Sequence, residues 1–75
     1  MNESMMLMFR DTMTLLIEKA REAKAEKDSS NSDYDIGRLM AFHDVISTIQ
    51  QQASAFGVSL AEIGLDSVDP DVELL

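Results

Sequence analysis

Two stretches of the chain carry apolar residues at alternating spacings of three and four positions, with a polar break between them. This period keeps apolar side chains along one edge of a helix, so each stretch is typical of a helix that packs along a seam. The large residues of the first seam are Met6, Phe9, Met13 and Leu16. Those of the second seam are Leu39, Phe42, Ile46, Ile49 and Phe56. We therefore predict an all-α protein whose hairpin core is formed by these side chains.

Local signals predict where the helices begin and end. We predict a first helix over residues 3–27, capped by Asn2 or Ser4, because short polar side chains accept hydrogen bonds from the first free amides. The polar residues at 28–33 favour a turn, and Ser32 or Asp33 then caps a second helix. This helix runs from residue 34 to 55 or 56, and Gly57 suits the position that ends it. A short connection between two long helices implies an antiparallel hairpin.

The residues after Gly57 divide into a capped turn and an acidic tail. Ser59 and Glu62 are spaced as a capping box, which predicts one short helical turn that Gly64 ends. Residues 65–75 mix carboxylates with scattered aliphatics, and Pro70 disfavours helix before it. We expect a helical hairpin domain with a short third helix over 1–64, followed by a mobile or lightly docked tail over 65–75.

Both helices carry more apolar surface than one seam needs. On the first helix Ile17 flanks the seam on one side, while Met5, Met8 and Leu15 flank it on the other. Together with the seam they span roughly 200° of the helix, whereas a two-layer contact uses ~100°. The second helix has a similar excess at its start. The side chains that we assign to a contact with a second copy are Met5, Met8, Leu15, Ile36 and Met40.

Leaving these side chains exposed would forgo on the order of 10 kcal/mol, because each contributes roughly 1.5–3 kcal/mol when it is buried. That loss is comparable to the whole stability of a small domain. We therefore predict a homodimer in which two hairpins form a four-helix bundle with closed two-fold symmetry. Two alternatives stay open: residues 58–75 fold back over the surplus surface within one chain, or a different protein covers it.

Length and composition narrow the possibilities further. A chain of 75 residues buries only ~60% of its unfolded surface, and this one has no cysteine for a disulfide or a thiolate metal site. With a single histidine, a His-based zinc site is excluded as well. The net charge is −8, and every Lys and Arg lies in the first 38 positions. We expect no direct binding to nucleic acid or to anionic membranes, since both need clustered cations.

The sequence also lacks the signals of export, membrane insertion and cofactor binding. No positive charge precedes the short apolar run near the N-terminus, and no stretch approaches the ~18 apolar residues of a membrane span. We therefore expect a cytoplasmic protein. A calcium loop counted from Asp33 fails its template, because Arg38 takes the glycine position and Asp44 the glutamate position. We expect no catalytic residue, no cofactor and no metal.

Histidine is the residue type that most readily changes charge near neutral pH, and His43 stands beside Asp44. Adjacent helix positions point about 100° apart, so Asp44 cannot orient the imidazole as a catalytic triad requires. We interpret His43 as a boundary residue where two copies meet. Its protonation would then weaken assembly in mild acid, because like charges would face each other.

Two other residues of the second helix have structural interpretations. Gly37 costs roughly 1 kcal/mol against alanine within a helix. We expect it to pack closely against the turn that contains Ala23, with close approach of a partner's backbone as the alternative. Arg38 is the one cation in an acidic stretch, and we expect it to pair with Asp35 or Glu26.

These features favour a non-enzymatic protein-interaction or regulatory module that acts as a homodimeric bundle. The alternative is an acidic inhibitor that imitates the charge of nucleic acid, of the kind that phages and mobile elements encode, because no Lys or Arg follows Arg38. Against this alternative, the second helix itself carries few carboxylates. An enzyme is disfavoured, because a two-helix unit has no pocket of its own and no acid–base pair is evident.

Overall fold

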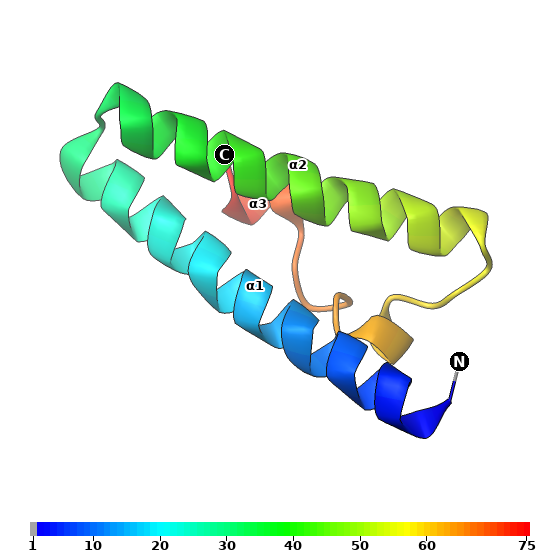
Figure 1. Cartoon of the computed structure of the whole chain (residues 1–75). Coiled ribbons are helices and arrows are strands. Elements are labelled where there is room, and N and C mark those ends of the chain that lie inside the picture. The colour runs from blue at the N-terminus through cyan, green and yellow to red at the C-terminus, as the bar shows by residue number, and fades with distance from the viewer. Residues whose placement is uncertain (1) are drawn as a thin grey trace.

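The computed structural model describes residues 2–75, which form an antiparallel helical hairpin and no strand. Helix α1 spans Glu3–Ser30 and helix α2 spans Asp33–Ala55. A 3-10 turn, η1, follows at Ala61–Ile63, and a one-turn helix, α3, spans Pro70–Glu73. In Figure 1 the two long helices lie side by side, and the segment after α2 returns between them so that α3 lies against α2. The all-α hairpin predicted from the two seams is confirmed.

The connection between the long helices is only two residues long. Helix α1 continues to Ser30, beyond the predicted end, and an ion pair one turn apart between Lys24 and Asp28 (3.3 Å) supports this extension. Asn31 then ends the helix in the left-handed region at φ 54°, and its amide donates to the carbonyl of Lys27 at 2.7 Å. Ser32 caps α2 by accepting from the amide of Asp35 at 3.2 Å. The predicted break at 28–33 is therefore reduced to residues 31 and 32.

The predicted caps elsewhere are confirmed by hydrogen bonds. The side chain of Asn2 accepts from the amide of Met5 at 2.8 Å. At the end of α2, Gly57 takes φ 70°, and the amide of Val58 donates to the carbonyl of Ala53 at 2.8 Å, which is a Schellman closure. The capping box of η1 is reciprocal: Glu62 accepts from the amide of Ser59 at 3.1 Å and donates its own amide to the Ser59 hydroxyl at 3.3 Å.

The core combines the hairpin seam with the last third of the chain. Leu65 and Leu74 are 0% and 1% exposed, and with Ile46 they are the largest fully buried side chains. The buried hydrophobic residues are Met13, Ile17, Ala20, Ala23, Leu39, Ile46, Ala53, Ile63, Leu65, Val68 and Leu74. The expected mobile or lightly docked tail is thus an integral part of the core. Its aliphatic side chains supply the burial that the hairpin seam alone does not. Pro70 stands at the start of α3, and residues 65–69 before it are not helical, as predicted.

Polar contacts hold the returning segment against one side of the hairpin. The side-chain amide of Gln50 donates to the carbonyls of Leu65 at 3.2 Å and Val68 at 3.0 Å. His43 Nε2 lies 2.8 Å from Asp71 Oδ1. On α1, Arg21 pairs with Glu73 at 3.5 Å and Lys24 donates to the carbonyl of Leu75. We call this covered side of α1 and α2, marked by Arg21, Lys24, His43 and Gln50, the closed face.

Two predicted core residues need correction. Met6 is partly exposed, and Phe56 is 78% exposed. The segment around η1 reaches α1 at this end, where a Cβ built on Gly64 would lie 3.9 Å from the carbonyl oxygen of Arg10. Figure 1 shows the two helices diverging towards the N-terminus of α1, with this segment between them. Met6 and Phe56 therefore do not meet across the seam as a simple hairpin would require.

The predictions for Gly37 and Arg38 have different outcomes. A Cβ built on Gly37 would meet nothing within 4 Å, so the expected close packing against the turn of Ala23 is wrong. Arg38 pairs with Glu26 on α1, as predicted. Its guanidinium carbon also lies 5.7 Å from the centre of the Phe42 ring, within cation–π range.

Candidate functional site

The side of the hairpin opposite the closed face is left uncovered by the chain. A helix advances about 100° per residue, so Val45 points about 200° away from His43, and Gln52 about 200° away from Gln50. We call this opposite side the open face. Its residues on α1 are Met5, Met8, Thr12, Leu15 and Leu16. Its residues on α2 are Arg38, Phe42, Val45, Ile49 and Gln52, with Phe56 directly after the end of the helix.

The open face exposes large apolar side chains along most of its length. Phe56 is 78% exposed and Met8 is 63% exposed, while Met5, Leu15 and Val45 are about half exposed. Behind them, the half-buried Phe9, Leu16, Phe42 and Ile49 pack against the core. Contiguous apolar surface of this kind marks contact sites more often than single exposed residues do. The open face is therefore the candidate functional site.

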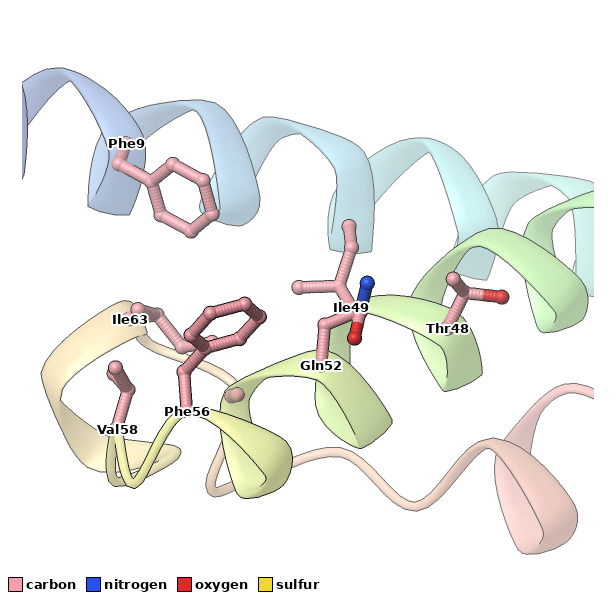
Figure 2. Close-up of a pocket in the computed structure, with 8 residues that line it drawn as sticks. Phe9, Thr48, Ile49, Gln52, Phe56, Val58 and Ile63 are labelled. Carbon is pink, nitrogen blue, oxygen red and sulfur yellow. The ribbon is translucent and has the colours of Figure 1, made fainter.

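An apolar groove of about 360 Å³ lies at the end of the open face where the helices diverge. Its walls come from α1, α2 and the segment around η1, and its lining residues are Phe9, Thr48, Ile49, Gln52, Ala53, Phe56, Val58 and Ile63. Figure 2 shows the rings of Phe9 and Phe56 on opposite sides of this space, with Ile63 and Val58 at one end and Ile49 at the other. Only Thr48 and Gln52 bring polar side chains, so the groove suits an apolar side chain.

A second, smaller groove of about 170 Å³ lies towards the connection between the helices, lined by Leu16, Arg38, Ala41, Phe42 and Val45. The guanidinium of Arg38 is held by Glu26 and lies over Phe42, so the aliphatic stem of Arg38 covers apolar surface beside Val45. This end of the open face is thus apolar at its base and charged at its rim.

The residues predicted for dimer assembly are divided between the two sides of the hairpin. Met5, Met8 and Leu15 lie on the open face. Met40, although 59% exposed, stands about 60° from His43 and therefore on the closed-face side of α2, and the half-buried Ile36 lies there as well. The structure thus does not bring the five predicted residues together. The apolar residues beyond the seam lie on both of its flanks, and the chain itself covers one flank.

The alternative in which the chain folds back on itself therefore holds for one flank only. Ile17, on the side of α1 towards the returning segment, is buried. Met5, Met8 and Leu15, on the other side, are not covered by residues 58–75. The sequence patterns do not predict Phe56 and Val45 on the open face, or Val58 and Ile63 as walls of its groove. Gly57, directly after Phe56, is the one signal that the chain turns away there.

His43 belongs to the closed face and not to the open face. Its Nε2 lies 2.8 Å from a carboxylate oxygen of Asp71, and its Nδ1 lies 3.7 Å from one of Asp44. Both ring nitrogens therefore face carboxylates, and the contact with Asp71 fastens α3 to α2. His43 therefore contacts its own chain, and its place where two copies meet stays a prediction.

The environment of Asp35, at the start of α2, shifts the pKa of its carboxyl group. Hydrogen bonds from the hydroxyls of Ser30 and then Ser32 stabilise the carboxylate and lower its pKa below the ordinary value of 3.8, and the nearby charge of Arg38 acts in the same direction. This carboxylate belongs to the helix connection and lies on neither face, so its role is local.

Among residues 2–75, no three His, Cys, Asp or Glu side chains are grouped so that they could hold a metal ion. In the same described part of the chain, neither long helix has the length and apolar character needed to cross a membrane. Comparison with protein-family models, with curated proteins and with solved structures finds no match to this chain.

Proposed function

We propose that this protein is a non-enzymatic helical interaction module that pairs with a second copy of itself through the open face to form a four-helix bundle. The observation that carries the proposal is the contrast between the two sides of the hairpin. One side is covered by the chain's own last segment, although Met40 and Val72 stay exposed there, whereas no segment of the chain covers Met8, Val45 and Phe56 on the other side. Burying such side chains contributes roughly 1.5–3 kcal/mol each, which favours a second layer on the open face.

The size of the face supports a stable dimer. The molecule measures 42 × 22 × 17 Å, so a side that runs along its length has a footprint of about 700 to 900 Å². Stable protein interfaces bury roughly 800 Å² per partner. A second hairpin laid on this face would therefore meet an area of the usual extent, with aromatic and methionine side chains of the kind that interface centres favour.

The distribution of charge supports a second copy as the occupant. With a net charge of −8, two copies repel each other unless their contact surface carries few carboxylates. The segment that covers the closed face holds four of the acids, at Asp66, Asp69, Asp71 and Glu73. On the open face, Glu26 at the rim is already paired with Arg38. Two copies can thus meet across the open face while most of their carboxylates stay in water.

The test is the molar mass in solution, measured by size-exclusion chromatography with light scattering at about 50 µM, where a moderately tight dimer is populated. The proposal predicts twice the 8.3 kDa of one chain. Val45→Glu places a charge at the middle of the open face and is expected to give a monomer with unchanged helical circular dichroism. Met40→Glu is the matched control, since Met40 is also exposed on α2 but lies on the closed-face side.

A monomeric unmodified protein at this concentration overturns the proposal. So does a dimer that Met40→Glu dissociates and Val45→Glu leaves intact, because the contact would then lie on the other flank. A stable complex in which one open face is covered by an unrelated protein, with the chain otherwise monomeric, overturns the self-pairing as well.

A further inference from the structure

The open face differs from one end to the other. At the end where the helices diverge it carries Met5, Met8 and Phe56 around the larger groove. At the end near the helix connection the rim is charged, with Lys19 and Glu26 on α1 and Arg38 on α2. This polarity restricts how two copies can be arranged, and the inference that follows depends on the pairing proposed above.

Two hairpins that pack face to face around a two-fold axis have two simple arrangements. With the axis parallel to the helices, like ends stay together and α1 of each copy lies on α2 of its partner. With the axis across the helices, the ends are exchanged, and each helix lies antiparallel on the same helix of its partner. The two arrangements bring different residues into contact, so the end-to-end polarity of the face can choose between them.

The arrangement with like ends together matches apolar surface with apolar surface. Met8 of one copy then lies over the groove beside Phe56 of the other, and an unbranched methionine side chain adapts well to such an irregular space. At the opposite end, Glu26 of one copy comes close to Arg38 of the other, so the rim charges are complementary.

The arrangement with exchanged ends matches apolar surface with charge. The methionines of α1 would lie against the charged half of the partner's α1, which carries Lys19 and Glu26. Phe56 would lie towards the partner's Arg38. Burying such charges against apolar side chains costs free energy that the first arrangement avoids.

We infer that the two copies are related by an axis parallel to the helices, and that Met8 of each copy occupies the groove of about 360 Å³ beside Phe56 of the other. Each groove is thus filled by the partner's first helix, and the larger groove is a self-recognition site. Leu15, near the middle of α1, lies far from its counterpart in this arrangement, because the two α1 helices are diagonal in the bundle.

The test is disulfide crosslinking, which the absence of native cysteine makes clean. A protein carrying Met8→Cys is mixed with one carrying Phe56→Cys under mild oxidation, and the covalent dimer is measured by non-reducing electrophoresis. A second mixture of Thr12→Cys with Gln52→Cys probes the same register at polar positions that do not remove apolar contact. Disulfides need Cα atoms within about 7 Å, so they report the register directly.

We expect both mixtures to give most of their protein as covalent dimer, and Leu15→Cys alone to give several-fold less. Light scattering on each reduced variant checks that association is retained. If the reduced proteins are dimers and Leu15→Cys crosslinks to itself while the two mixtures do not, the ends are exchanged and this inference is wrong. Failure of all three crosslinks in a dimeric protein also overturns it, whereas a monomeric unmodified protein overturns the pairing itself.

Discussion

The closed and open faces of this hairpin begin from similar apolar patterns and end in different states. On the closed face, Gln50 and His43 bond to the returning segment, and Leu65 of that segment is fully buried in the core. On the open face, Gln52 and Phe56 are exposed and line a groove. The comparison teaches that similar apolar flanks need not be covered alike: on the flank that the chain covers, polar side chains also reach the backbone of the covering segment.

The largest expected effect tests whether the closed face is part of the core. Leu65→Ala removes a fully buried side chain and is expected to lower the free energy of unfolding by about 2–5 kcal/mol, measured by urea denaturation. Both substitutions are made in the Val45→Glu background, so that folding is measured separately from pairing. There, Phe56→Ala is expected to change the free energy of unfolding by about 0.5 kcal/mol or less. Equal losses of unfolding free energy for the two variants would contradict the distinction between a closed face in the core and an open face outside it.

A smaller effect tests the polar contacts of the closed face. Gln50→Ala leaves the carbonyls of Leu65 and Val68 without their donor and is expected to cost about 1–3 kcal/mol. Gln52→Ala, two positions away on the open face, is the matched control and is expected to be near neutral in the same background. A neutral Gln50→Ala in urea denaturation would mean that the segment docks through its aliphatic side chains alone.

A gain in stability is expected at a position that touches neither face. Gly37 lies in α2 with open space where a side chain would be, so Gly37→Ala is expected to stabilise the protein by about 1 kcal/mol, seen as a higher melting temperature. Gly57→Ala is the contrast, because its φ of 70° disfavours any side chain, and a loss is expected there. Destabilisation by Gly37→Ala would indicate that something closely approaches this position after all.

The smallest effect concerns the helix connection. Ser30→Ala is expected to raise the pKa of Asp35 towards 3.8, because the hydroxyl that stabilises the carboxylate is lost. Since the pKa is lowered in the folded state, Asp35 contributes stability that is present above pH 3.8 and is lost as the pH falls through the folded-state value. An NMR titration of the Asp35 side chain measures this, and an unchanged pKa in Ser30→Ala would contradict it.

The parts of the fold that the sequence predicts well depend on short separations. The heptad seams, the caps at Asn2 and Ser32 and the capping box of Ser59 all follow from spacings of a few residues. The pairing of Arg38 with Glu26 follows once the hairpin is assumed. Such signals are local, so one sequence contains all that they need.

The parts that were missed depend on where the chain goes after α2. The two turns at Gly57 and Gly64 send the last segment to one flank of the hairpin, and nothing in a helical projection specifies which flank. Burial of Leu74, exposure of Phe56 and the separation of Met40 from Met8 all follow from that choice. The sequence therefore predicts only part of the candidate site. It identifies Met5 and Met8 as surface residues, but it places Phe56 in the core, where the structure leaves it exposed.

The two-residue connection at Asn31 and Ser32 has a consequence for the order of folding. Contacts beside it join residues close in sequence, so their loop-closure entropy is small, whereas the bond from Arg21 to Glu73 spans 52 positions. We expect the hairpin to nucleate at this connection and zip outwards, with the final segment docking late. Brief openings of the native molecule then release that segment first, and amides near Leu74 exchange with solvent sooner than those near Ile46.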